Sequence, residues 1–295
     1  MSVIRPRLRS RRSRVIPAGV VLAAAAGFAL APVLPAGATT HPAGMHRSGS
    51  TSTAAMSHPE RDFAGSTIPA HEPVARGGGG GIHRAASGLP GLDVSGYQGN
   101  VDWGTVAADG AAFAYVKATE NTDYTNPYFS QQYDGAYAAG LIRGAYHFAT
   151  PDRSSGTAQA DYFVDNGGGW SPDGKTLPPM LDIEYNPYGA TCYGLSQDSM
   201  VGWISDFVNE VHARTNKWAT IYSTFDWWST CTGNSAAFAA NDPLFIASYS
   251  SSVGTLPAGW GYYTFWQYAD SGTFPGDQDV FNGTEQNLIN LATLT

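Results

Sequence analysis

Cysteine and basic residues are both scarce in this sequence, and each shortage argues against one kind of binding site. Only two of the 295 residues are cysteine, too few for a cysteine-based zinc site, and five of the seven histidines precede residue 84 without metal-ligand spacing. Lysine and arginine number 16 against 24 aspartates and glutamates, and no basic patch is interleaved with aromatic rings. A nucleic-acid backbone is therefore not an expected partner. We expect no metal, no cofactor and no nucleic acid.

The first 38 residues have the pattern of an export signal. Residues 5–14 hold six arginines, Val15–Leu34 is an apolar stretch, and small residues ending in Ala38 form a cleavage site. The Arg11-Arg12 pair is also compatible with a twin-arginine signal, so the Sec and twin-arginine routes both stay open. Two prolines and many alanines in the apolar stretch disfavour a retained membrane anchor. We expect a secreted, extracellular protein with no stable membrane association after cleavage.

Residues 39–87 form a second region, which is rich in Ser, Thr, Gly, Ala, Pro and His. They show no sustained apolar period, so they should bury too little apolar surface to offset their ordering entropy. The run Gly77–Gly81 is not followed by Lys-Ser/Thr, which argues against a phosphate-binding loop. This composition predicts a disordered linker or pro-segment. At residue 88 the composition becomes that of a globular protein, and we expect residues 88–295 to form a single folded domain.

Short apolar segments alternate with helix-like segments in this domain. The expected strands are Gly91–Val94, Ala112–Lys117, Ile142–Phe148, Pro179–Glu184, Ala219–Ser223, Leu244–Ser248, Tyr262–Tyr268 and a short one near Val280. The expected helices include Asn126–Ala139, Thr157–Phe163 and Ser199–Arg214. Eight buried strands with interleaved helices are typical of a parallel β/α barrel. Because several connections are too short for full helices, we expect an irregular, partly helix-depleted (β/α)8-like barrel of the α/β class.

Two acids in the fourth expected strand, Asp182 and Glu184, give the strongest chemical signal. Residues two apart on a strand face the same side and lie about 7 Å apart at their backbones. Burying two acids on one face carries a large desolvation cost. Glycoside hydrolysis needs two carboxyl groups, one to protonate the leaving oxygen and one to support a cation-like centre. An isolated pair is weak evidence, because acidic pairs on solvated strands are common.

Further acids and aromatic rings strengthen this signal. The active site of such a barrel lies at the carboxyl ends of its strands, where Asp93 closes the first strand and Asp277 precedes the last. Flat rings beside carboxylates suit pyranose faces, although core packing is the alternative for each ring. The rings expected near strand ends are Tyr97, Tyr146, Tyr185, Tyr222, Trp266 and Tyr268. Three separate segments that deliver four carboxylates to one mouth predict a glycosidase site.

An ordered set of motifs carries a family resemblance. The motifs are Leu92-Asp-Val-Ser-Gly-Tyr-Gln98, Phe113-Ala-Tyr-Val-Lys-Ala-Thr-Glu120, Gly144-Ala-Tyr-His-Phe-Ala149, Met180-Leu-Asp-Ile-Glu184, and Trp266-Gln-Tyr268 with Gly276-Asp-Gln-Asp279. Together they resemble the glycoside hydrolase family 25 lysozymes, particularly the secreted actinobacterial type, from about Gly88 to Leu294. The resemblance implies an irregular β/α barrel that hydrolyses the β-1,4 bond between N-acetylmuramic acid and N-acetylglucosamine in peptidoglycan, with retention. Bacterial cell-wall peptidoglycan is therefore the expected partner of a chain that we expect to be monomeric.

The resemblance also implies roles for the acids. Glu184 is expected to be the general acid, and Asp182 its partner, which either stabilises the charged centre or orients the substrate's acetamido group. Asp93 and Asp277 match two further acidic positions of the family, and Asp279 receives no defined role. The expected substrate-binding residues are Tyr97, Lys117, Tyr146, Tyr222, Trp266 and Tyr268.

Other residues keep two interpretations. Lys117 and Glu120 either contact substrate at the rim or form a structural ion pair, and His147 either contacts substrate or is a core histidine. Trp227-Trp228 either forms a sugar subsite or packs a loop. In an exported protein, Cys192 and Cys231 are expected to form a disulfide that closes a loop of about 40 residues, the alternative being two unpaired thiols.

Two other functions compete with a lysozyme. A chitinase-like glycosidase would carry a longer acidic motif, D-x-x-D-x-D-x-E, whose additional aspartates are missing from Leu177–Leu181. A catalytically inactive cell-wall-binding module would keep the groove without its chemistry. The presence of acids at all four positions argues against that module.

Overall fold

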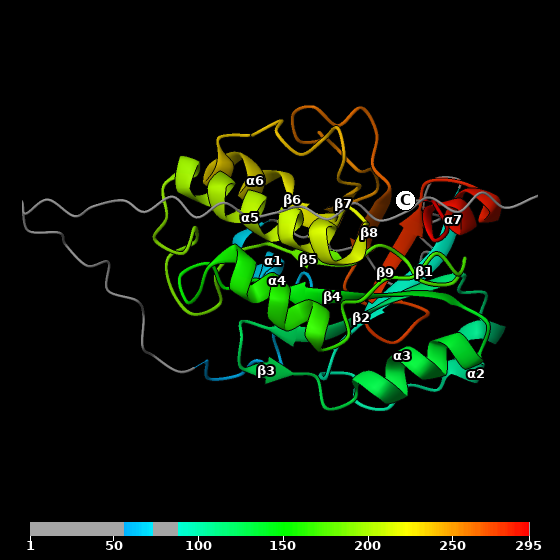
Figure 1. Ribbon diagram of the computed structural model, residues 1–295. Helices are drawn as coiled ribbons and strands as arrows, with labels where there is room; N and C mark the ends of the chain where they lie inside the picture. The colour runs from blue at the N-terminus through cyan, green and yellow to red at the C-terminus, as the bar shows by residue number, and fades with distance from the viewer. Residues whose placement is uncertain (1–55, 73–87, 295) are drawn as a thin grey trace, which may run out of the picture. The chain divides into compact units, whose positions relative to one another are not determined.

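The computed structural model describes residues 56–72 and 88–294 (Figure 1). The expected export signal and the remainder of the expected linker lie outside the described residues. None of the helices in the described ranges is long and apolar enough to span a membrane.

The strands form one closed sheet. Their bounds are β1 Leu89–Val94, β2 Phe113–Glu120, β3 Tyr124–Thr125, β4 Ile142–Phe148, β5 Met180–Asp182, β6 Thr220–Thr224, β7 Leu244–Ala247, β8 Phe265–Ala269 and β9 Asp277–Phe281. The order is β1-β9-β8-β7-β6-β5-β4-β2-β3, and pairing of β1 with β2 closes the barrel. The short β3 folds back on β2 and stands outside the closed ring of eight strands. This arrangement confirms the expected (β/α)8-like barrel.

The last strand corrects the expectation of an all-parallel sheet. β9 pairs antiparallel with both β8 and β1, whereas the pairings of β1, β2 and β4 to β8 with one another are parallel. The reason is the short connection, residues 270–276, because a parallel connection needs a crossover of a dozen or more residues. The fourth strand is also shorter than expected, since β5 ends at Asp182.

Helices cover only part of the outside of the barrel. Their bounds are α1 Ile68–His71, α2 Trp103–Ala108, α3 Phe129–Ala138, α4 Gly156–Asp165, α5 Gln197–Thr215, α6 Phe225–Thr232 and α7 Glu285–Leu291. The hydroxyl of Ser196 caps α5 by accepting the N–H of Ser199, and Asn216 ends that helix in the left-handed conformation. Residues 248–264 and 270–276, all of them described, contain no helix. The barrel is therefore helix-depleted near β8, as expected.

The hydrophobic core has an inner and an outer part, because successive strand residues point to opposite sides. Inside the barrel, Phe113, Tyr115, Phe245 and Phe265 make ring contacts across the sheet. Outside it, Ile183 and other strand residues pack against α4, α5 and α6. The inner part fills the barrel below the strand ends with apolar side chains.

Residues 56–72, hereafter the docked segment, differ from the expected disordered linker. Ala64 and Ile68 are buried and belong to the inner hydrophobic cluster of the barrel. The segment ends in the one-turn helix α1, which Figure 1 shows in blue beside the strands. Its apolar residues pack on the barrel rather than on one another, which an argument from its own composition does not foresee.

Candidate active site

Four buried carboxyl groups meet at one end of the barrel. Asp93 lies near the end of β1, Asp182 ends β5, and Glu184 follows two residues later. Asp277 is the first residue of β9, and the antiparallel direction of this strand brings it to the end at which the parallel strands finish. Asp93 and Asp277 are direct partners in the β1–β9 ladder. The structure thus brings together the four predicted acids, each at most 1% exposed.

The Gln267 side chain links two of these acids. Its Nε2 donates hydrogen bonds to Asp93 Oδ2 at 2.7 Å and to Asp277 Oδ2 at 2.9 Å. Its Oε1 accepts from the hydroxyls of Tyr222 at 2.6 Å and Tyr249 at 3.0 Å. Neither Gln267 nor Tyr249 was predicted from the sequence. Strand alternation allows either Gln267 or its two aromatic neighbours to face inward, and the prediction chose the aromatic rings.

Burial changes the acid–base properties of these groups. Burial raises the pKa of Glu184 to about 8, against the lowering effect of hydrogen bonds from the docked segment. It raises the pKa of Asp93 to about 7. Burial, and next the charge of Glu184, raise the pKa of Asp182 well above its usual value. A carboxyl that keeps its proton near neutral pH has the property that a general acid needs.

Glu184 and Asp182 differ in their hydrogen bonds. Glu184 accepts the backbone N–H of Gly65 at 2.7 Å through Oε1 and the hydroxyl of Thr67 through Oε2. Neither carboxyl oxygen of Asp182 has a hydrogen-bond partner among the described residues. Both oxygens of Asp182 are therefore able to accept a donor from a bound molecule.

Three of the predicted tyrosines lie around the acids. The buried hydroxyl of Tyr146 accepts the N–H of Ala64 at 3.3 Å, and Tyr222 is held by Gln267. Tyr97 is 62% exposed, and its ring contacts Phe63 with the centroids 5.2 Å apart. Tyr97 thus presents an accessible ring at the rim, whereas Tyr146 and Tyr222 present hydroxyls from inside the mouth.

Trp266 and Tyr268 do not join the acids, contrary to the expectation that they bind substrate. They belong to the hydrophobic cluster on the outer faces of β7, β8 and β9, and their rings contact each other at 5.9 Å. The indole N–H of Trp266 donates to the carbonyl of Ser248 at 2.9 Å. Alternation along β8 explains the difference, since Phe265 and Gln267 take the inward positions.

Lys117 and Glu120 form a buried ion pair, one of the two interpretations that the sequence left open. Their side chains are both 0% exposed, and Nζ lies 2.6 Å from Glu120 Oε2. Lys117 Nζ also donates to the carbonyl of Pro59 at 2.9 Å and to the carbonyl of Asp62. The charge of Lys117 lowers the pKa of Asp182, which places this ion pair within electrostatic reach of the acids.

His147 is a core histidine. Its Nδ1 lies 2.8 Å from the hydroxyl of Thr119 and its Nε2 lies 2.9 Å from Gln159 Oε1. Its ring stacks on Phe207 of α5 and contacts Phe163 of α4 on the outside of the barrel. Burial lowers its pKa to about 3, so the imidazole is neutral at neutral and mildly acidic pH. Its side chain points away from the acids.

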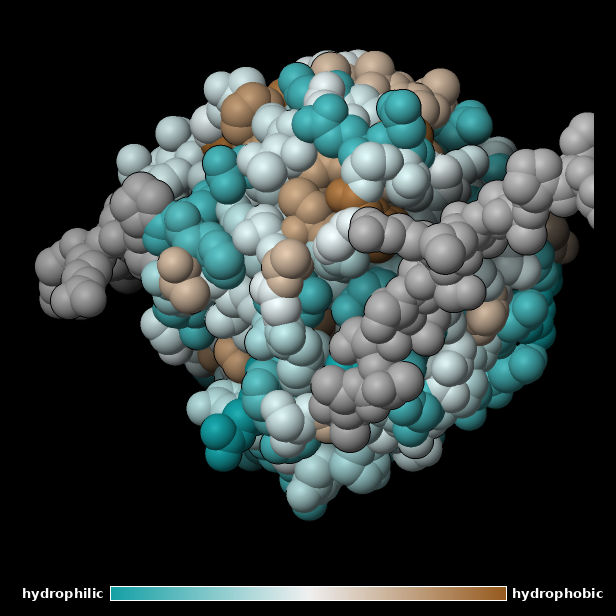
Figure 2. Space-filling model, turned by 90° about the vertical axis from the view of Figure 1, so that its left-hand side faces the viewer, coloured by the Kyte–Doolittle hydropathy of each residue, from teal (hydrophilic) through white to brown (hydrophobic). Residues whose placement is uncertain are grey.

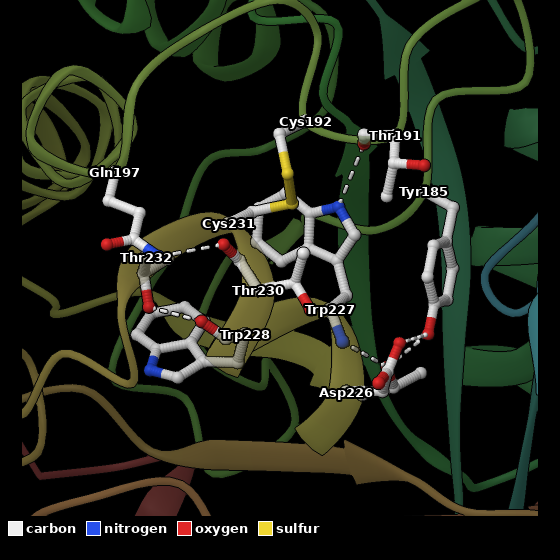
Figure 3. Close-up of a disulfide and its surroundings, with 11 residues drawn as sticks. Tyr185, Thr191, Cys192, Gln197, Asp226, Trp227, Trp228, Thr230, Cys231 and Thr232 are labelled. Atoms are coloured by element: carbon white, nitrogen blue, oxygen red, sulfur yellow. Dashed lines mark hydrogen bonds between the residues drawn. A yellow bond between two sulfur atoms is a disulfide. The ribbon is translucent and has the colours of Figure 1, made fainter.

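The predicted disulfide is present, and it joins the loop after β5 to α6 (Figure 3). Cys192 and Cys231 are bonded, with their Cα atoms 5.3 Å apart. Trp227 and Trp228 beside it are fully buried, and the indole N–H of Trp227 donates to the carbonyl of Thr191 at 3.2 Å. The two tryptophans therefore pack this loop and present no ring to a sugar.

The surface near the mouth is mixed in polarity. α1 and β3 lie toward the left of Figure 1, and Figure 2 views the molecule from that side. Where grey atoms do not cover it, this face consists mostly of hydrophilic and intermediate residues, and its hydrophobic residues form small groups. Within residues 56–72 and 88–294, no group of three or more His, Cys, Asp or Glu is arranged to hold a metal ion.

The fold and the acids define a class of protein. A model of the family Glycosyl hydrolases family 25 matches residues 92–277, a span that contains all four acids. The chain belongs to glycoside hydrolase family 25, and it is a glycoside hydrolase.

Individual members of this class are similar over most of their length. Lysozyme M1 of Streptomyces globisporus is 51% identical over 214 residues, which are 71% of this chain and 73% of that protein. An N,O-diacetylmuramidase of a Chalaropsis species is 49% identical over 209 residues, 70% of this chain and 99% of that protein. The solved structure of a muramidase from Acremonium alcalophilum is 58% identical with a TM-score of 0.69, and the match covers 70% of this chain and 99% of that one.

Proposed function

We propose that this chain is an exported N-acetylmuramidase, a lysozyme that hydrolyses the β-1,4 bond between N-acetylmuramic acid and N-acetylglucosamine in bacterial peptidoglycan. The observation that carries the proposal is the pair Asp182 and Glu184, two buried acids on one side of a strand end at the barrel mouth. The names of the similar lysozyme and muramidases support the substrate.

Glu184 is the general acid in this proposal. Its pKa is raised to about 8 by burial, so the carboxyl holds a proton at neutral and acidic pH. It donates this proton to the glycosidic oxygen as the bond to the anomeric carbon breaks. The leaving sugar then departs as a neutral alcohol instead of an alkoxide.

Asp182 supports the positive charge that develops at the anomeric carbon, directly or through the substrate's acetamido group. The absence of hydrogen-bond partners for both its oxygens, among the described residues, leaves it ready for either contact. The neighbouring charge of Lys117 favours its ionised form, while burial opposes it. In both routes Asp182 or the acetamido group covers the face opposite the leaving sugar, so the water that completes the reaction enters from the face that the sugar has left, which gives retention.

Asp93, Asp277 and Gln267 form a bridged set beside this pair. The amide of Gln267 holds the two aspartates at fixed positions. Their polar oxygens, with the hydroxyls of Tyr146 and Tyr222, line the mouth where the hydroxyl and acetamido groups of the sugars would bind. The exposed ring of Tyr97 supplies a flat apolar surface for a sugar face at the rim.

The test is product analysis with residues 88–295, which contain the whole family match; the similarity to the Chalaropsis and Acremonium enzymes spans 70% of this chain and 99% of each of theirs. Purified protein digests peptidoglycan, new reducing ends are reduced with borohydride, and mass spectrometry identifies them. We expect reduced muramic acid. Reduced N-acetylglucosamine would show a glucosaminidase instead, and the absence of cleavage would favour a wall-binding module.

A Glu184→Gln variant of the same fragment tests the role of the acid. The amide keeps the shape of the side chain but has no proton to donate, and general acid catalysis is worth about 10²- to 10⁴-fold. We expect turnover to fall by about 10³-fold while the melting temperature and cosedimentation with cell walls are retained. Equal turnover by the wild type and the variant would exclude Glu184 as the general acid.

A further inference from the structure

The docked segment lies across the acids, and the family match does not include it. The match begins at residue 92, whereas the docked segment ends at residue 72. Between Ala64 and Thr67, backbone and side-chain groups of this segment hydrogen-bond to Tyr146, Gln267 and Glu184. A stretch of polypeptide thus occupies the position at which the proposed reaction requires a glycan.

The segment occupies both oxygens of the proposed general acid. The N–H of Gly65 lies 2.7 Å from Oε1 of Glu184, and the hydroxyl of Thr67 donates to Oε2. Both partners are donors, so while the segment is bound both carboxyl oxygens are engaged and neither is free to meet a glycosidic oxygen. The carbonyl of Ala64 meanwhile accepts from Nε2 of Gln267 at 2.9 Å, the same nitrogen that holds the aspartate pair.

Gly65 fits against the polar groups of the mouth with no room for a side chain. Its φ is +91°, a conformation that favours glycine. A Cβ atom at this position would lie 2.1 Å from the hydroxyl of Tyr249, 2.6 Å from Oε1 of Gln267 and 2.9 Å from the hydroxyl of Tyr222. The backbone therefore touches the floor of the site directly and excludes a sugar from the same space.

Contacts on both sides of Gly65 hold the segment in place. Before it, Lys117 binds the carbonyls of Pro59 and Asp62, as described above, and the hydroxyl of Tyr188 binds the carboxyl of Asp62. After it, Ile68 is 2% exposed inside the inner cluster.

The C-terminal end of the segment is held by Tyr185. The imidazole of His71 stacks on the Tyr185 ring with the centroids 4.1 Å apart, and Glu72 Oε1 accepts a hydrogen bond from the hydroxyl of the same tyrosine at 2.6 Å. These contacts combine charge, apolar burial and hydrogen bonds over the length of the segment.

We propose that the docked segment, residues 56–72, is an intramolecular inhibitor that occupies the glycan cleft, so that the chain is latent until this segment leaves. The inference rests on the proposed function, because it takes the mouth of the barrel to be the glycan site. Residues 73–87 connect the inhibitor to the catalytic domain. Hydrolysis of one peptide bond in this connection, with addition of one water, would allow the segment to dissociate.

The experiment compares initial rates of cell-wall lysis by the full chain, by its Gly65→Ala variant and by residues 88–295. The added methyl group clashes with the floor of the site, and residues 88–295 are unchanged. We expect residues 88–295 and the Gly65→Ala chain each to lyse walls at least about tenfold faster than the full chain, which corresponds to ~1.4 kcal/mol. Ala70→Arg, at an exposed position of α1, is the matched control and should leave the full chain slow.

The outcomes separate this inference from the proposed function. If residues 88–295 do not cleave walls, the proposed function fails. If they cleave walls at the same rate as the full chain, the inhibitor is overturned and the function stands. If they are faster but the Gly65→Ala chain stays slow, inhibition does not come from the docked segment as seen here, and the inference is again overturned.

A binding measurement gives a second readout that does not depend on turnover. The Glu184→Gln variant is made in the full chain and in residues 88–295, and each is sedimented with purified walls. We expect the shorter protein to cosediment and the full chain to remain mostly in solution. Equal sedimentation of both would contradict occupation of the cleft.

Discussion

Neighbouring residues in β4 and β8 have different environments, because successive side chains of a strand point to opposite sides. On the inner side, Tyr146 and Gln267 hydrogen-bond at the barrel mouth. On the outer side, His147 and Trp266 lie one residue away in the sequence and pack in hydrophobic clusters under helices and loops. The comparison teaches that the direction of a side chain, more than its residue type, decides whether it reaches the site.

Buried ionisable groups on the inner and outer sides of the barrel also differ in their pKa shifts and in their hydrogen-bond partners. On the outer side, burial lowers the pKa of His147 to about 3, and the neutral ring has a hydrogen-bond partner at each nitrogen. On the inner side, burial raises the pKa of Asp93 and Asp182, and the oxygens of Asp182 have no partner among the described residues. The outer side is built for packing, and the inner side keeps hydrogen-bonding capacity for a ligand.

Trp266→Ala in residues 88–295 should have the largest effect on stability. Removing a buried tryptophan side chain creates a cavity on the outer side, and such truncations cost about 3–5 kcal/mol. We expect urea unfolding to show a loss in this range, while the kcat of the remaining folded protein changes by less than about twofold. If kcat falls while the free energy of unfolding is unchanged, Trp266 acts at the substrate site, contrary to this prediction.

Gln267→Leu should affect activity instead. The substitution removes a donor shared by two carboxylates, and a hydrogen bond to a charged group is worth about 1.5–3 kcal/mol. We expect kcat/KM for soluble glycan fragments to fall by about 10- to 100-fold. Gln159→Leu is the matched control, because Gln159 is equally buried but holds His147 on the outer side, so it should lower stability and leave kcat unchanged. Equal effects of both variants on kcat would contradict the division between the two sides.

The pH dependence of stability gives the smallest effect for a change of one pH unit. Asp93 has a folded-state pKa of about 7 against an ordinary value of 3.8, so the folded chain binds more protons between these values than the unfolded chain does. Stability should therefore be highest below about pH 4 for this group and should fall as pH rises to 7, by at most about 1.4 kcal/mol per pH unit. Melting curves of the full chain and of Asp93→Asn test this, because the variant should lose less stability over the range. Parallel curves would show that Asp93 is not the group responsible.

Much of the fold and of the acid set could be predicted from local patterns. Strand alternation placed Asp182 and Glu184 on one side, and short connections predicted missing helices. The same alternation, applied to Trp266-Gln-Tyr268, separates Gln267 from its two neighbours but does not say which side faces inward, and the preference for aromatic rings at sugar sites favoured the wrong side. The antiparallel direction of β9 depends on the length of one connection, which the strand pattern alone did not distinguish.

The docked segment could not be predicted, for a different physical reason. Composition tests whether a segment can form a core of its own, and residues 56–72 cannot do so. They are ordered in the structure because Ala64 and Ile68 enter a cluster that the barrel supplies, and because Lys117 and Tyr188 bind Asp62 from outside the segment. The entropic cost of ordering this segment is offset by contacts with the barrel, whose residues are distant from the segment in the sequence.

The carboxyl oxygens of Asp182 and Asp279 have no hydrogen-bond partner within residues 56–72 and 88–294, and this has a consequence for the stability of the protein. Buried acids without partners lower the stability of a fold, and uncharged residues of similar size would suit the same positions better. A chain selected only for resistance to heat would lose these acids first, and Asp182 is the acid that we propose as the partner of Glu184. Stabilising substitutions in this barrel should therefore be made in the outer layer and should leave the mouth unchanged.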